Sequence, residues 1–221
     1  MGGRIYLHPL LERIWHGIHA LSILMLILSG AQIHWPEWVH IFGGWQNAIS
    51  VHNFFGLVVV GDFFLWLIYN LVSRRITHYL PNREDIPKGI IVQVRFYVYG
   101  IFKHEPHPHS PSVDEKFNSL QKIVYLLFMF LMMPLLLVSG VLYLYPLYFC
   151  FSDFAAYLYP PFVGGLRVIA IIHFIMAAIF TAFFIVHIYL ATTGHTILDN
   201  FISVITGYAM TSNDKEKGAG F

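Results

Sequence analysis

Two histidines, His173 and His187, stand fourteen positions apart in an almost uninterrupted apolar stretch, residues 171–191. On an α-helix this spacing separates the two side chains by ~21 Å and leaves them within roughly 40° of the same face. A polar ring in hydrocarbon is costly unless it meets a partner, so two rings on one stripe predict partners at two depths. Two stacked haems, each with its iron held by imidazole, would supply those partners.

The composition indicates that such a helix lies in a membrane. Of 221 residues, 57% are hydrophobic, 17% aromatic and only 11% charged, which is too little charge to coat a soluble globule. A net charge of +1 without a dense basic patch excludes a nucleic-acid footprint. The lone cysteine, Cys150, permits neither an intrachain disulfide nor a CxxCH haem attachment, so any haem must be held without covalent links.

Four segments are apolar over about 20 residues, the length that crosses a bilayer. We expect residues 1–221 to form one all-α domain, an integral membrane four-helix bundle with two stacked b-type haems. The first segment reaches Ile33 without a small-residue cleavage pattern before it, so we interpret it as a retained span and not a signal peptide. The predicted spans are residues 14–34, 51–72, 119–145 and 167–193.

The segments that connect the spans differ in charge. The two short connections, residues 31–50 and 146–165, contain no lysine or arginine. Basic residues gather instead near both termini and in the long connection, residues 73–118. Because positive charge stays on the cytoplasmic side, we expect both termini and this connection to face the cytoplasm.

With that orientation, the intramembrane histidines sort by depth. His52 opens the second span from the outer side, and His173 lies at matching depth in the fourth. His16 and His187 both lie towards the cytoplasmic side. The sequence therefore predicts an outer pair, His52 with His173, and an inner pair, His16 with His187, each binding one haem iron. His19 is an alternative to His16, since it lies three residues on and on nearly the same face.

Histidines within membrane spans also have roles besides haem ligation. A single intramembrane histidine is often an interhelical hydrogen-bond partner, but four that pair by depth favour haem ligation. A transition-metal transporter would need carboxylates or thiolates beside the histidines, and the predicted spans offer only Asp62. Asp62 either lies on a proton route or bonds a neighbouring helix.

Several motifs carry a family resemblance across nearly the whole chain. They are Arg-x-x-His at 13–16, His-x-Phe-Phe-Gly at 52–56, Asn-x-x-Gln-Lys at 118–122 and the fourteen-residue interval between His173 and His187. With these motifs in this order, the chain resembles the gamma-type cytochrome b subunits of membrane-bound formate dehydrogenases, NiFe hydrogenases and thiosulfate reductases. The resemblance implies the same outer and inner pairs, and it favours His16 over His19.

The resemblance also implies that menaquinone or ubiquinone reacts on the cytoplasmic side, with Asn118 helping to bind the quinone head. A side-chain amide suits a quinone carbonyl, and Gln121 lies on a neighbouring face. Leu120 replaces a glycine that some relatives carry, which changes the expected shape of the pocket. The alternative for Asn118 is an N-cap of the third span, which the local sequence also supports.

Two segments of the long connection have distinctive compositions. The segment His104–Ser110 is rich in histidine and proline and could chelate a metal, but prolines keep such a segment extended, so we interpret it as a solvated loop. The segment Gly89–Lys103 is apolar with scattered positive charge and too short to span. We expect it to lie along the inner interface.

The function predicted from these features is that of a di-haem cytochrome b subunit in the inner membrane of a bacterium or archaeon. It would anchor an oxidoreductase complex in lipid and carry electrons between the quinone pool and an extracytoplasmic iron-sulfur or multihaem cytochrome subunit. The chain has no cysteine cluster and no substrate-site chemistry of its own, so a separate catalytic subunit is expected. The alternative is a free-standing membrane haem protein, such as a ferric reductase or a metal-handling transporter.

Overall fold

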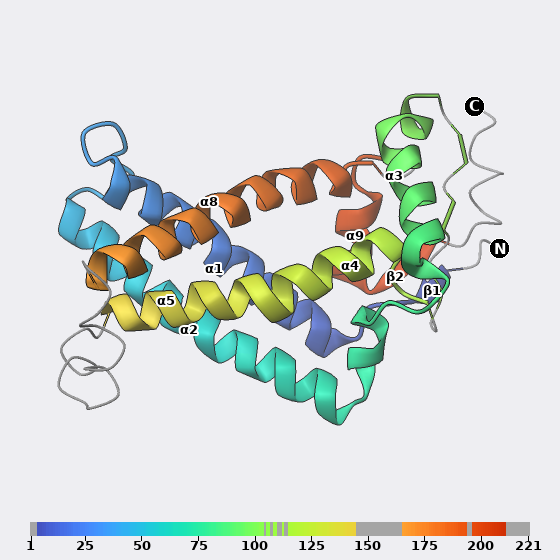
Figure 1. Cartoon of the computed structure of the whole chain (residues 1–221), viewed down its shortest axis with the longest axis horizontal. Coiled ribbons are helices and arrows are strands. Elements are labelled where there is room, and N and C mark those ends of the chain that lie inside the picture. Colours follow the sequence, from blue (N-terminus) through green and yellow to red (C-terminus); the bar gives the residue numbers. More distant parts are fainter. Residues whose placement is uncertain are drawn as a thin grey trace. The chain divides into compact units, whose positions relative to one another are not determined.

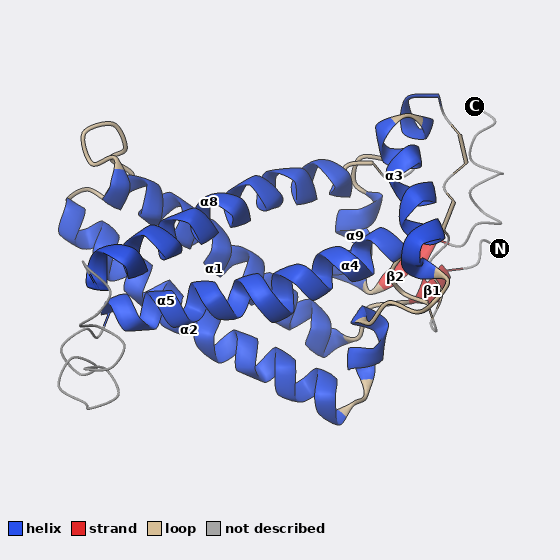
Figure 2. Cartoon of the chain, viewed as in Figure 1, coloured by secondary structure: helices blue, strands red, loops and turns tan. Residues whose placement is uncertain are grey.

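Helices make up most of the described chain in a computed structural model (Figure 2). The structure describes residues 4–103, 105–106, 108–109, 112, 115–144, 165–193 and 196–210. Cys150, His104, His107 and residues 146–164 of the second short connection lie outside the described residues. The elements labelled in Figure 1 are β1 (Arg4–Tyr6), α1 (Leu10–His34), α2 (Trp45–Val72), α3 (Ile90–Val98), α4 (Ser119–Leu127), α5 (Met133–Leu144), α8 (Gly165–Ala191), α9 (Asp199–Thr206) and β2 (Tyr208–Met210).

Within the described residues, four helical stretches are long and apolar enough to cross a membrane: α1, α2, the run Ser119–Leu144 through α4 and α5, and α8. The number of predicted spans is therefore confirmed. The first two helices begin earlier than predicted, at Leu10 and Trp45 instead of positions 14 and 51. Hydropathy marks only the apolar part of a helix, whereas backbone hydrogen bonds continue through polar residues at its ends.

The distribution of side chains on these helices is the reverse of that in a soluble protein. The side chains that are almost fully buried include polar ones, among them Ser22, Gln32 and Asn70. Large apolar side chains such as Leu65 and Ile185 are exposed instead. In a bilayer, polar groups must find partners inside the protein while apolar side chains face the lipid. This distribution supports a multi-pass membrane protein whose apolar faces contact lipid.

The third span is interrupted by a wide helical turn. A π-helical turn, Phe128–Met132, separates α4 from α5 immediately before Met133 and Pro134. Proline lacks a backbone N–H and its ring crowds the carbonyl four residues earlier, so the helix widens there to accommodate it. Such a turn shifts the face that α5 presents relative to α4.

The chain divides into two compact units, and each long helix contributes a segment to both. The first unit is Met1–Ile14 with Leu67–Phe130 and His187–Phe221, and the second is Trp15–Trp66 with Leu131–Val186. In the second unit, segments of α1, α2, α5 and α8 contact one another through buried polar side chains.

In the first unit, the two ends of the described chain pair as a short antiparallel sheet. Arg4 lies opposite Met210 and Tyr6 opposite Tyr208. Gly207, with φ +89°, precedes β2, and its carbonyl accepts hydrogen bonds from the N–H groups of Leu7 and His8. This positive φ favours glycine. The sequence analysis expected an all-α chain and did not predict this sheet, since three-residue strands are too short for an alternating pattern.

A buried amide holds the connection before α2 in place. The side chain of Gln32, near the end of α1, donates to the carbonyl of Gly43 at 3.0 Å and accepts from the N–H of Phe42 at 2.8 Å. Gly43 adopts a positive φ of 79° at this turn. These contacts set where α2 begins, at Trp45, about two turns before His52.

Candidate functional site

The structure brings together the rings of the outer pair, His52 from α2 and His173 from α8, within the second unit. Their ring centroids are 6.2 Å apart and their planes make an angle of 75°. A metal–imidazole bond measures about 2 Å and a ring centre lies roughly 1 Å from its nitrogen, so two imidazoles on opposite sides of one metal ion have centres about 6 Å apart. The observed separation fits a bis-histidine iron.

Each ring of the outer pair makes a hydrogen bond with a buried serine on another helix. Nδ1 of His52 lies 3.0 Å from Oγ of Ser29 on α1, and Nδ1 of His173 lies 3.1 Å from Oγ of Ser139 on α5. With Nδ1 engaged in both rings, Nε2 is the nitrogen through which either histidine can bind a metal. The sequence analysis missed both serines.

A glycine follows each of these serines and lies against the same ring. A Cβ atom added at Gly30 would be 3.4 Å from Cε1 of His52, and one added at Gly140 would be 3.1 Å from Cε1 of His173. The imidazoles therefore rest on helix backbone that a side chain would partly cover. The recurrence of Ser-Gly in the first and third spans is the sequence signal that could have identified both serines.

The inner pair is divided between the units, with His16 in the second and His187 in the first, and it stays a prediction. His19, the alternative to His16, has a carboxylate partner: its Nδ1 lies 2.8 Å from Oδ2 of Asp62, which is only 6% exposed. The ring of Trp15 stacks on His19 at 5.1 Å, and its Nε1 donates to the Asp62 carbonyl. Asp62 thus bonds a neighbouring helix, which is one of the two roles that its position in the second span predicted.

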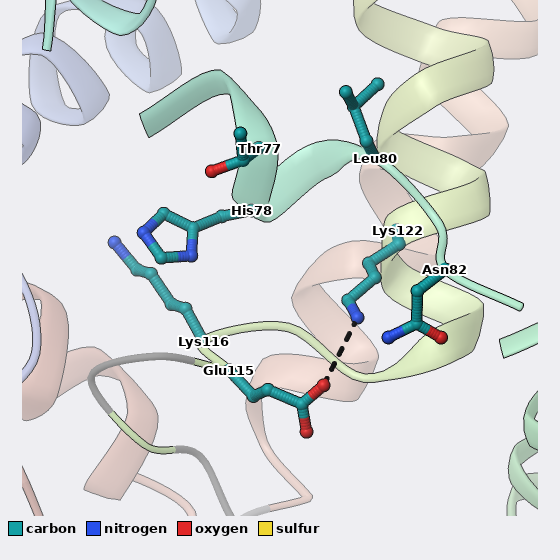
Figure 3. Close-up of a pocket in the computed structure, with 7 residues that line it drawn as sticks. All are labelled: Thr77, His78, Leu80, Asn82, Glu115, Lys116 and Lys122. Carbon is teal, nitrogen blue, oxygen red and sulfur yellow. Dashed lines mark ion pairs between the residues drawn. The ribbon is translucent and has the colours of Figure 1, made fainter. Parts of the chain in front are cut away.

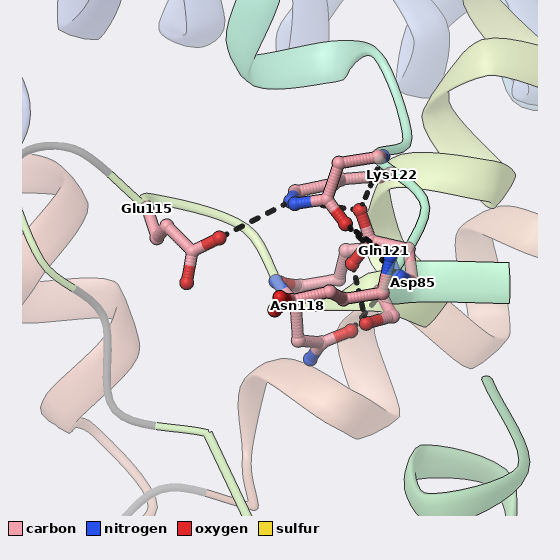
Figure 4. A network of polar contacts seen from close by, with 8 residues as sticks. Asp85, Glu115, Asn118, Gln121 and Lys122 are labelled. Carbon is pink, nitrogen blue, oxygen red and sulfur yellow. Dashed lines mark hydrogen bonds and ion pairs between the residues drawn. The ribbon is translucent and has the colours of Figure 1, made fainter. Parts of the chain in front are cut away.

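Asn118 and Gln121 form a reciprocal cap at the start of α4 (Figure 4). Oδ1 of Asn118 accepts from the Gln121 N–H at 2.9 Å, and Oε1 of Gln121 accepts from the Asn118 N–H at 3.0 Å. The N-cap alternative for Asn118 is therefore confirmed. Its remaining polar atom, Nδ2, lies 3.5 Å from the hydroxyl of Tyr97. Burial raises the pKa of this hydroxyl, which accordingly stays protonated at neutral pH.

A buried ion pair lies beside this cap in the first unit (Figure 4). Nζ of Lys122 is 3.0 Å from Oδ2 of Asp85, which also accepts from the N–H of Asn82 at 2.7 Å, while the Ser119 hydroxyl donates to Oδ1 at 2.6 Å. Burial by itself would raise the pKa of Asp85, but the Ser119 and Asn82 hydrogen bonds and the Lys122 charge together lower it. The ionised carboxylate joins the long connection to the first turn of α4.

A polar cavity of about 380 Å³ lies on the same turn of α4 (Figure 3). Two lysines contribute to its lining, and both are paired with carboxylates: Lys122 with Asp85 and Glu115, and Lys116 with Glu12. Asn118 and Gln121, the two residues predicted to bind the quinone head, do not line it. The sequence analysis therefore pointed to the neighbouring residues and did not predict this cavity. Its lining consists of Thr77, His78, Leu80, Asn82, Glu115, Lys116 and Lys122.

Comparison with known proteins identifies the family. Residues 7–207, which include all four predicted ligand histidines, match the family described as prokaryotic cytochrome b561. The chain belongs to the prokaryotic cytochrome b561 family. It is also similar to the protein named "Putative cytochrome YdhU" of Escherichia coli (strain K12), with 31% identity over 210 residues that cover 94% of this chain and 75% of the relative. This chain is thus a multi-pass membrane b-type cytochrome of electron transfer, as the resemblance predicted.

Proposed function

We propose that this cytochrome holds two haem b groups, one between His52 and His173 and the other between His16 and His187. The observation that carries the proposal is the outer pair, whose rings lie 6.2 Å apart with both Nδ1 atoms turned to serines. When bound, haem b supplies reversible one-electron chemistry at its iron. The chain's own contribution is to hold the imidazoles at two depths and to exclude water from them.

We propose further that the two sites form an electron path between an extracytoplasmic partner subunit and the quinone pool. The spacing of His173 and His187 on α8 supports this, since it places one ligand towards each membrane surface, ~21 Å apart along the helix. The distribution of basic residues supports an inner pair on the cytoplasmic side. Because the single cysteine of this chain cannot hold an iron-sulfur cluster, the proposal assigns the redox partner to an iron-sulfur or multihaem cytochrome subunit and substrate chemistry to a separate catalytic subunit.

Purification of the full-length chain from its native membranes tests the proposed function. We expect two haems per chain, all extractable by acidified acetone because CxxCH is lacking, together with a co-purifying iron-sulfur or multihaem cytochrome subunit. A quinol should reduce the haems in this preparation. One haem per chain would overturn the di-haem assignment. A chain purified without partner subunits that reduces ferric chelates would favour the free-standing reductase instead.

Asn118 is the residue through which quinone binding can be separated from helix capping. In Asn118→Asp the carboxylate still accepts from the Gln121 N–H, but the Nδ2 donor is lost, whereas Asn118→Leu removes both functions. Loss of one hydrogen bond to a quinone carbonyl costs about 1 kcal/mol, or several-fold in affinity. We therefore expect both variants to weaken binding of a quinone-analogue inhibitor, and only Asn118→Leu to lower the melting temperature.

Inhibitor titration and thermal unfolding on the same two variants decide the role of Asn118. Both haem spectra should remain unchanged and serve as the folding control. If Asn118→Asp binds the inhibitor as well as the parent chain does, Asn118 is only a cap, and the quinone head must be sought elsewhere, first in the cavity beside Lys122.

A further inference from the structure

The same three-residue arrangement occurs twice around the outer pair, on different helices. In each case a helix supplies a Ser-Gly pair, the serine hydroxyl lies about 3 Å from Nδ1 of a histidine, and the glycine backbone supports the ring edge. The first set is Ser29 and Gly30 of α1 with His52, and the second is Ser139 and Gly140 of α5 with His173. Both serines are buried, at 0% and 5% exposure, so water does not compete for their hydroxyls.

The hydroxyl protons decide the direction of these hydrogen bonds. A serine hydroxyl has one proton, and Ser29 donates it to the carbonyl of Met25 at 2.7 Å. Ser139 donates its proton to the carbonyl of Leu136 at 3.0 Å. Each oxygen is then left as an acceptor towards the imidazole, so the proton of that bond is on Nδ1 of the ring. A neutral imidazole protonated on Nδ1 carries its lone pair on Nε2.

We propose that Ser29 and Ser139 are the positioning residues of the outer haem. Each serine relays a hydrogen bond from its histidine to a backbone carbonyl, which selects the tautomer that binds iron through Nε2 and holds the ring at a set angle. An acceptor on Nδ1–H also raises the basicity of the ligand and so favours ferric iron. This inference rests on the proposed ligation by His52 and His173.

Alanine substitution of each serine tests the inference on the full chain. In Ser29→Ala and Ser139→Ala the Nδ1–H loses its hydroxyl acceptor and keeps only the nearby backbone carbonyl of Leu26 or Leu136, so the midpoint potential of the outer haem should rise. Haem retention against an apo-haem acceptor should fall by about 10–100-fold, as for other partners of metal-bound histidines. The double variant should show a larger rise than either single one. Ser29→Thr and Ser139→Thr keep the hydroxyl and should restore the parent potential.

The electron paramagnetic resonance spectrum of the ferric protein provides a second measurement. If the serines had only a structural role, their substitution would leave the g values of the outer haem unchanged. The g values of a low-spin bis-histidine haem depend on the angle between the imidazole planes, 75° in this structure. We expect both alanine variants to shift the outer-haem signal and to leave the inner-haem signal unchanged.

Thr181→Val is the matched control on α8. Thr181 donates its hydroxyl proton to the carbonyl of Ala177 at 2.8 Å, so this variant removes the same kind of hydroxyl-to-backbone bond. Its potential and g values should equal those of the parent chain. Alanine variants of Ser29 and Ser139 that behave like Thr181→Val would overturn the inference. If His52→Ala and His173→Ala also kept both haems, the proposed function itself would fail, so the two failures are distinguishable.

Discussion

Replacing His52 or His173 with alanine is expected to remove the outer haem and to leave the inner haem in place. These two imidazoles, whose ring centroids lie 6.2 Å apart, would hold the proposed outer haem together, so the loss of either would leave its iron with one ligand of the proposed pair. Electron transfer from the extracytoplasmic partner should fall to background in both variants, while a quinol should still reduce the remaining haem. Haem content by pyridine haemochromogen and a potentiometric titration measure both effects.

His34→Gln is the control for this pair. His34 lies at the end of α1, and its ring stacks on that of Phe174, the neighbour of His173, at 4.4 Å. It has a ring contact in the same region but no place in the proposed ligand set, so the variant should keep both haems. Full haem content in both the His52 and the His173 variants would refute the outer site.

Replacing His16 with alanine is expected to remove the inner haem, whereas His19→Gln should retain it. His19 already has a buried partner, since its Nδ1 lies 2.8 Å from Oδ2 of Asp62, and this hydrogen bond accounts for its place in the membrane without a haem. Glutamine can still donate to Asp62, so the substitution does not leave a buried carboxylate unpaired, which would cost about 3–5 kcal/mol. Loss of the inner haem should abolish reduction of the outer haem by quinol.

The opposite result for these two variants would reverse the assignment of the inner ligand on α1. If His19→Gln loses the inner haem and His16→Ala retains it, His19 is the ligand and Asp62 is its hydrogen-bond partner. Asp62→Asn separates the cases further: it should leave the inner haem potential unchanged if His16 is the ligand, and raise it if His19 is.

The sequence by itself determined the features that depend on local pattern and on depth in the membrane. Hydropathy and the rise per residue of a helix predicted the four spans, because an apolar run of about 20 residues can satisfy its own backbone hydrogen bonds in a bilayer only as a helix. Depth alone pairs His52 with His173, which the structure brings within 6.2 Å. The cap at Asn118 was predictable as well, since its partner Gln121 is three residues away on the same helix turn.

Only the tertiary structure decided which side chains meet across helices. Ser29 lies 23 positions from His52, and Ser139 lies 34 positions from His173. Their contacts depend on how far each helix is rotated about its axis, and a nearly uniform apolar sequence carries no strong moment that would set this rotation. For the same reason the partner of Asp62 remained open until packing placed His19 beside it. Depth follows from counting residues along one chain, whereas rotation follows from the fit of several helices together.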